Sequence, residues 1–120
     1  MIFLRKKRKR TIPPDLLEPK YFEEVGYLEF YEIYDKFIVL FHNKSYKKFK
    51  KADLVKLAKL IGDRCCIEAG ALHGTEDITD AYKKMKKVSE LGLQLSKNDD
   101  YLLKNLEFAT EELKDFEEDS

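Results

Sequence analysis

The second half of the chain carries apolar residues at a regular helical spacing. Apolar positions recur at steps of three and four residues along three stretches, from Leu54 to Leu72, from Ile78 to Leu91 and from Leu102 to Phe116. A repeat close to 3.6 residues places such side chains on one face of a helix. The pattern therefore predicts three amphipathic helices after Lys51.

Glycine and small polar residues mark where these helices are expected to begin and end. Gly62 lies inside the first stripe, and because glycine weakens a helix, a break at this position stays open. Gly92 predicts the end of the second helix, since glycine is a common C-terminal stop. Ser96, followed three residues later by Asp99, resembles a capping box and predicts the start of the third helix.

Residues 21–49 hold ten of the chain's fifteen aromatic residues. Aromatic and β-branched side chains favour strands. We therefore predict strands over 27–34 and 37–41, and a short edge strand over 45–49 after a loop at Asn43 and Lys44. The fold class that follows is α+β, with a small antiparallel sheet within 27–49 followed by the three helices.

An all-α alternative stays open for the same segment. Phe30, Ile33, Phe37 and Leu40 also follow the spacing of a helix face. Helical propensity of aromatic residues is poor, which favours the strands.

Charge and length together predict the domain organisation. A chain of 120 residues fits one domain. We expect a basic arm and proline-containing linker over 1–20, a single globular domain over 21–116 and an acidic tail over 117–120. Charge blocks at the two ends oppose packing, so both ends are expected to be mobile.

The formal net charge of zero conceals opposite charges in the two halves of the chain. Residues 1–60 contain 15 Lys and Arg against 8 Asp and Glu, and residues 61–120 contain 8 against 15. Six consecutive cations run from Arg5 to Arg10, while the C-terminal end is acidic. Opposite charges at the two ends favour association of the ends with each other or with a neighbouring copy.

The basic arm is the strongest candidate for a binding function. Consecutive cations neutralise phosphates and release condensed counterions, so they predict nucleic-acid binding that weakens as salt rises. A second basic segment, residues 44–51, interleaves lysines with Tyr46 and Phe49, which suits phosphate contact together with base stacking. The candidate nucleic-acid-binding residues are Arg5, Lys6, Lys7, Arg8, Lys9, Arg10, Lys47, Lys48, Lys50 and Lys51.

Other interpretations of these basic segments stay open. The arm also fits a nuclear-import signal, a contact with an acidic protein surface, or a solvated tail without a partner. In the second segment, the two rings also fit burial in the core, because aromatic side chains bury large apolar areas.

The sequence offers little support for catalysis, a metal or a cofactor. It contains no glycine-rich phosphate loop, no nucleophile elbow and no zinc-protease motif. Its four soft ligands, Cys65, Cys66, His42 and His73, lack the paired spacing of a structural zinc site. Cys66 and His73 lack a third group to orient them as a catalytic pair. We therefore expect a protein that is not an enzyme and needs no cofactor.

The cysteines and the apolar runs predict the compartment. Adjacent residues such as Cys65 and Cys66 rarely form a disulfide, which favours a reducing environment. No run approaches the roughly 18 apolar residues of a membrane-spanning helix. Met1 to Leu4 precede the cations, the reverse of the order in a secretory signal. The expected location is intracellular, either cytoplasmic or nuclear, without membrane contact.

These observations favour a small non-enzymatic protein that associates with DNA or RNA through its basic arm. The alternative is a protein–protein adaptor, or an accessory subunit of a larger viral or ribonucleoprotein assembly. Its partner would bind the aromatic-rich segment 21–49, because surplus aromatic residues and opposite terminal charges are features of interfaces.

Overall fold

The structure is a computed structural model that describes residues 9–71 and 77–118. Within these residues the chain forms five α-helices and two short 3₁₀ helices, and none of the described residues lies in a β-sheet. Arg10 and Phe49 form an isolated bridge. The elements in chain order are η1 (Pro14–Leu17), α1 (Pro19–Glu24), α2 (Tyr27–His42), η2 (Ser45–Lys48), α3 (Lys51–Ala71), α4 (Asp77–Leu95) and α5 (Asp100–Glu118).

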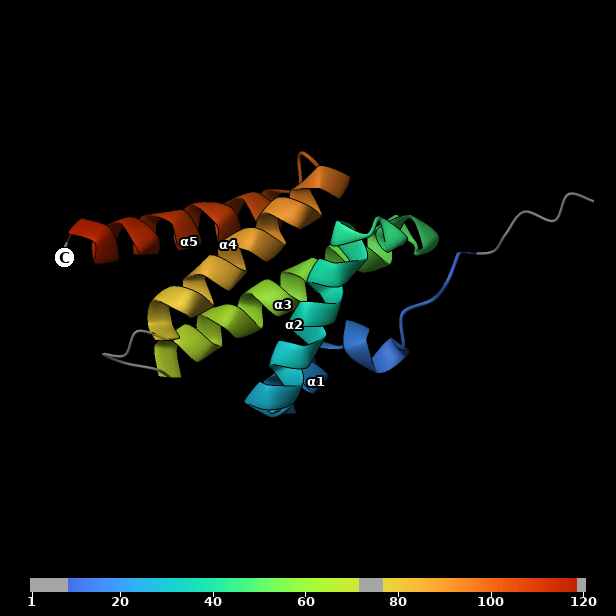
Figure 1. Cartoon of the computed structure of the whole chain (residues 1–120), viewed down its shortest axis with the longest axis horizontal. Coiled ribbons are helices and arrows are strands. Elements are labelled where there is room, and N and C mark those ends of the chain that lie inside the picture. The colour runs from blue at the N-terminus through green and yellow to red at the C-terminus, as the bar shows by residue number, and fades with distance from the viewer. Residues whose placement is uncertain (1–8, 72–76, 119–120) are drawn as a thin grey trace, which may run out of the picture.

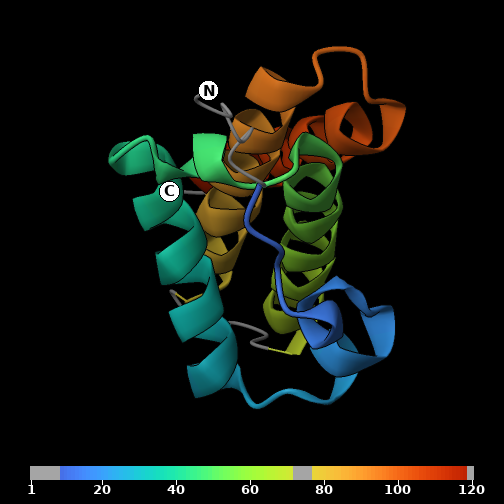
Figure 2. The same cartoon turned by 90° about the vertical axis from the view of Figure 1, so that its right-hand side faces the viewer.

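The helices form two groups that share α3 as their centre. On one side, α4 packs against both α3 and α5. On the other side, α2 crosses α3, and the short α1 lies beside the N-terminal end of α2 (Figure 1). Figure 2 shows the N-terminal segment passing between α2 and α3. Because α3 has neighbours on both sides, it supplies more buried residues than an ordinary one-sided amphipathic helix would.

The predicted sheet is wrong, and the fold is all-α over the described residues. Residues 27–34 and 37–41 lie in one continuous helix, α2, and residues 45–48 form η2. Phe30 and Phe37 are 0% and 1% exposed. Residues seven positions apart lie on one face of a helix, so one continuous helix carries both rings into the core. Burial of both rings in one core therefore overrides the strand preference of the aromatic residues.

The predicted loop at Asn43 and Lys44 lies where the chain leaves α2. Lys44 has φ of 63°, in the left-handed region, which ends the helix and redirects the chain. The side-chain oxygen of Asn43 accepts a hydrogen bond from the backbone N–H of Ser45 at 3.0 Å. This local bond is the Asx turn that asparagine favours, so the turn is encoded by its own residues.

The three helices predicted after Lys51 are present as α3, α4 and α5, but the end predicted at Gly92 and the cap predicted at Ser96 are wrong. The break left open at Gly62 is absent, because α3 runs through it. A Cβ at Gly62 would lie 3.2 Å from the side chain of Asn105 and 3.7 Å from that of Val88. The helix predicted to end at Gly92 continues to Leu95.

Gly92 is required by packing, not by a helix end. A Cβ at this position would lie 2.7 Å from a methyl carbon of Leu102 and 3.0 Å from the Cβ of Ala58. These two residues belong to α5 and α3, so Gly92 marks a point where α3, α4 and α5 approach closely around one backbone. Sequence periodicity alone does not distinguish such a glycine from a helix stop.

The third helix is capped by Asp99, not by Ser96 as predicted. The backbone N–H of Leu102 donates to Oδ1 of Asp99 at 3.0 Å. Nζ of Lys59, on α3, lies 2.8 Å from Oδ2 of the same carboxylate. The bond from Lys59 and the backbone N–H groups hold the pKa of Asp99 below its ordinary value of 3.8. Asp99 therefore joins the start of α5 to the middle of α3.

Replacing Asp99 by alanine is expected to lower the free energy of unfolding by about 1–2 kcal/mol at neutral pH, because a cap and an ion pair are both lost. Asp99→Asn keeps a capping oxygen and loses only the charge, so we expect it to cost less than about 1 kcal/mol. Urea unfolding followed by circular dichroism measures both changes.

The pH dependence of the Asp99→Asn difference has a definite sign. A carboxyl group with a depressed folded-state pKa stabilises the protein above its unfolded pKa, and this contribution is lost as the pH falls through the folded pKa. The wild type should therefore exceed Asp99→Asn in stability at pH 7, and the difference should be smaller at about pH 3, below the ordinary pKa of 3.8. A difference that is the same at both pH values would contradict the assigned ion pair.

Candidate nucleic-acid interface

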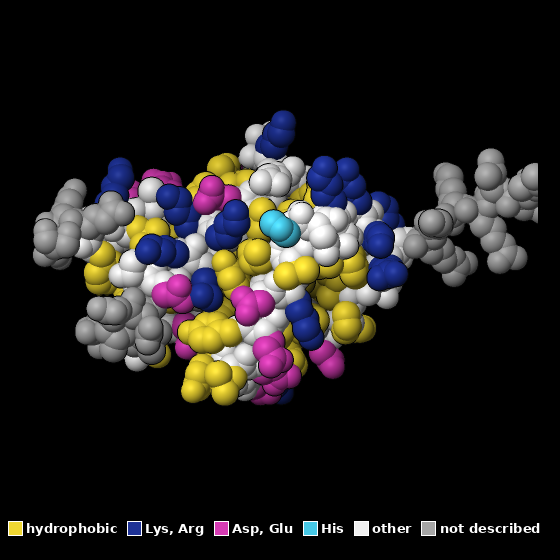
Figure 3. Space-filling model, viewed as in Figure 1, with side chains coloured by type: hydrophobic (Ala, Val, Ile, Leu, Met, Phe, Trp, Pro, Cys, Tyr) yellow, Lys and Arg dark blue, Asp and Glu magenta, His cyan; other side chains and the backbone are white. Residues whose placement is uncertain are grey.

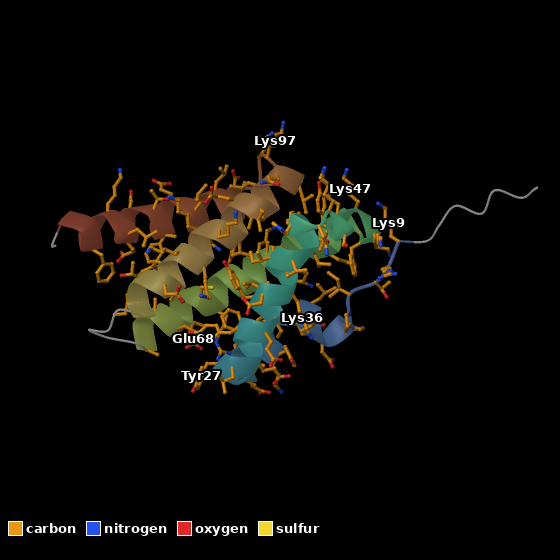
Figure 4. All side chains as sticks on the ribbon, viewed as in Figure 1. Lys9, Tyr27, Lys36, Lys47, Glu68 and Lys97 are labelled. Carbon is orange, nitrogen blue, oxygen red and sulfur yellow. The ribbon has the colours of Figure 1, made fainter. Side chains whose placement is uncertain are left out.

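The structure describes two of the six arm cations, and it places them against the second basic segment. Lys9 and Arg10 are described and exposed, whereas Arg5, Lys6, Lys7 and Arg8 lie outside the described residues. The backbone N–H of Arg10 donates to the carbonyl oxygen of Lys48 at 2.6 Å. Nζ of Lys9 donates to the carbonyl oxygen of Lys47 at 2.7 Å. Figure 4 shows Lys9 and Lys47 at the same end of the molecule.

The aromatic residues of the second segment anchor it to the body of the protein. The ring of Tyr46 stacks on Phe41, with centroids 4.7 Å apart and planes 9° apart. Phe49 is half-buried. One face of the Tyr46 ring is therefore covered by Phe41. This contact fits the alternative interpretation in which the rings of Tyr46 and Phe49 pack against the core. Because the rings turn inward at η2, the lysines beside them are left on the surface.

The result is a single surface of seven exposed cations, which we call the basic end. None of the three ion pairs among residues 9–71 and 77–118 involves these cations. Figure 3 shows dark blue side chains gathered at this end of the molecule. Clustered charges of one sign produce a positive potential that attracts polyanions. The members of the basic end are Lys9, Arg10, Lys44, Lys47, Lys48, Lys50 and Lys51.

Lys44 begins the second basic segment but was not among the candidate nucleic-acid-binding residues. Its role in the sequence was that of a turn residue, next to Asn43. The left-handed backbone at Lys44 is the reason that η2 folds back on α2. Its place at the start of the basic segment was the signal available in the sequence.

The lysines of α4 differ from those of the basic end. Lys84 forms an ion pair with Asp80 at 2.6 Å. Its Nζ also lies 5.5 Å from the ring centroid of Tyr31 and 5.3 Å from that of Tyr34. Such cation–π contacts tie α4 to α2. Lys84 therefore has a structural role, whereas Lys83 and Lys87 are exposed on the outer side of the helix.

The two cysteines have properties of unreactive thiols. Burial raises the pKa of Cys65 to about 12, and it also raises the pKa of Cys66. The thiolate is the nucleophilic and metal-binding form, so both side chains are poorly suited to either role at neutral pH. Within residues 9–71 and 77–118 there is no group of three His, Cys, Asp or Glu side chains placed to hold a metal ion. His73 lies outside the described residues.

No helix in the described part of the chain has the length and apolar character needed to cross a membrane. Comparison of the chain with protein-family models, with characterised proteins and with solved structures gives no significant match.

Proposed function

We propose that the protein is a non-enzymatic nucleic-acid-binding protein whose phosphate-binding surface is the basic end, extended by the arm cations Arg5 to Arg8. The observation that carries the proposal is the backbone pairing of Arg10 with Lys48 at 2.6 Å. It joins two basic segments 38 residues apart into one surface. An intracellular setting, cytoplasmic or nuclear, is part of this proposal, because nucleic acid and free thiols both belong to such compartments.

The chemistry of the basic end favours a phosphate backbone as the ligand. Each exposed cation that contacts a phosphate releases counterions, and the gain accumulates over a polyanion with regularly spaced charges. Phosphate contacts position a protein on nucleic acid without reading its sequence. With one face of the Tyr46 ring already stacked on Phe41, base stacking contributes less than the lysines do. Binding is accordingly expected to depend on charge and salt more than on sequence.

The test is the affinity of the full chain for a fluorescein-labelled 20-nucleotide DNA and for the matching RNA, measured by fluorescence anisotropy. We expect affinity to fall at least about tenfold between 50 and 200 mM salt. Neutralising all six arm cations, Arg5 to Arg10, with glutamine should abolish most of the binding.

The basic end has its own variant, in which Lys47, Lys48, Lys50 and Lys51 are replaced by glutamine. We expect it to bind about tenfold or more weakly at 50 mM salt, with a visibly smaller salt dependence. The control removes the same charge elsewhere, from the exposed lysines of α4 and α5, and should retain most of the affinity. Its substitutions are Lys83→Gln, Lys87→Gln, Lys104→Gln and Lys114→Gln.

Two results would contradict the proposal. Equal loss in the two four-lysine variants would mean that only total charge matters and that the basic end is not a site. Displacement of the labelled nucleic acid by polyglutamate, at an equal concentration of charges, would instead indicate a surface for acidic proteins.

A further inference from the structure

A second surface, which differs in its chemistry from the basic end, lies between α2 and the N-terminal segment. It is an apolar groove of about 730 Å³, a volume typical of ligand-binding sites. Val39 lines this groove, and its side chain is 54% exposed. The groove is therefore open to solvent, and it is lined by apolar residues from three parts of the chain, among them Ile12, Leu16, Ile33, Leu40 and Phe49.

The groove carries mostly negative charge. Four carboxylates line it, one from η1 and three from α2, and Lys36 is its single cation. The hydroxyl of Tyr21 donates to Glu29 at 3.2 Å. The three ion pairs of the described residues involve none of these carboxylates. Figure 4 labels Lys36 on α2, beside the N-terminal segment. The four carboxylates are Asp15, Glu29, Glu32 and Asp35.

The apolar and acidic residues run beside each other along α2. Ile33, Phe37 and Leu40 follow one another at steps of four and three, which is one apolar stripe of the helix. Glu29 and Glu32 are three residues apart and form an adjoining acidic stripe. The stretch from Glu29 to Leu40 is about 16 Å long at 1.5 Å per residue. This length matches two to three turns of a helical peptide.

We infer that this groove binds a cationic amphipathic segment of a partner protein, with apolar side chains on the floor and Lys or Arg beside the carboxylates. The charge of the groove disfavours anionic ligands, because four carboxylates repel phosphates and fatty-acid headgroups. An amphipathic helix laid in an apolar groove is a recurring mode of peptide recognition. The inference does not rest on nucleic-acid binding, because the basic end carries the opposite charge and shares no residue with the groove.

The test uses a fluorescein-labelled twelve-residue peptide of leucine and lysine, with leucines at helical spacing, and the full-length protein. A peptide in which glutamate replaces every lysine is the control for charge. Fluorescence anisotropy at 150 mM salt should show saturable binding of the lysine peptide, at least about tenfold tighter than the glutamate peptide.

A pair of substitutions on α2 locates the binding site. Val39→Arg places a cation in the groove and should weaken the lysine peptide about tenfold. Leu28→Arg makes the same change at a position that is 67% exposed and does not line the groove, so it should leave binding unchanged. Both side chains are exposed, so neither change threatens the fold.

A second set of variants tests the carboxylates. Neutralising Glu29, Glu32 and Asp35 with their amides should weaken the lysine peptide about fivefold. Neutralising three exposed acids of α5, Asp100, Glu107 and Glu111, should change the affinity less than twofold.

Three outcomes would overturn the inference. Equal binding of the lysine and glutamate peptides would indicate a groove without charge selection. Equal effects of Val39→Arg and Leu28→Arg would place the peptide elsewhere.

Residues 1–8 combine an apolar run with cations, so they are a rival occupant. Tighter peptide binding by a full-length variant with Ile2, Phe3 and Leu4 replaced by serine would identify that segment, and no partner, as the occupant.

Discussion

We expect Arg64→Met to lower the free energy of unfolding by about 3–5 kcal/mol, which is a large loss for a single substitution. Arg64 is only 8% exposed. Its Nε lies 2.7 Å from Oε1 of Glu68, and its Nη1 donates to the carbonyl oxygen of Phe22. The guanidinium also lies 5.3 Å from the ring centroid of Phe30. One cation thus joins α1, α2 and α3.

The loss is large because of what the substitution leaves behind. Methionine fills much of the space of the arginine stem but leaves the carboxylate of Glu68 without its cation. The side chain of Glu68 is 13% exposed, so solvent compensates little. The carbonyl oxygen of Phe22 also loses its side-chain donor. An uncompensated buried charge costs more than the ion pair itself contributes.

Urea unfolding followed by circular dichroism measures the effect, and a double variant isolates its cause. Arg64→Met with Glu68→Met removes both charges, and we expect it to recover at least about 1 kcal/mol relative to the single variant. Lys56→Met, at an exposed position of α3, is the control and should change stability by less than about 0.5 kcal/mol. No recovery in the double variant would show that the buried charge of Glu68 is not the cause.

The second large effect is expected at Gly92, where Gly92→Val should lower the free energy of unfolding by about 3 kcal/mol. The new Cβ would meet Leu102 at 2.7 Å and Ala58 at 3.0 Å. Both neighbours are 0% exposed, and the contact with Ala58 is with a Cβ that is fixed to the backbone of α3. The helices α3, α4 and α5 must then separate around the added atoms, and the contacts of this part of the core weaken.

Gly70→Val provides a matched control on α3. A Cβ at Gly70 has no neighbouring atom within 4 Å, and the residue is exposed. Valine has a higher helical propensity than glycine, so Gly70→Val should leave stability unchanged or raise it by a few tenths of a kcal/mol. Thermal and urea unfolding of the two variants give the comparison. Similar stability of Gly92→Val and Gly70→Val would contradict the close approach of the three helices.

The sequence was sufficient to predict α3, α4 and α5 because their apolar residues repeat with the period of a helix. It failed at α2, where two local signals conflict. Aromatic residues favour strands, whereas Phe30 and Phe37 lie seven positions apart, as two buried residues on one helix face do. Only the location of the core decides between these signals.

The candidate sites show the same division. The sequence identified two basic segments and the aromatic-rich region as separate features. Their relation depends on contacts between distant residues, such as the bond from Arg10 to the carbonyl oxygen of Lys48. The residues that line the groove are likewise distributed from Ile12 to Leu57, so no continuous sequence motif predicts it.

The amino-acid sequence by itself determined the helical periods, the turn at Asn43 and Lys44, and the positions of the charge blocks, because these properties act over a few neighbouring residues. Tertiary structure alone decided the helical state of residues 27–42, the true role of Gly92 and the union of the basic segments. Each of these depends on which distant side chains share the core, and burial in a shared core is a property of the whole chain.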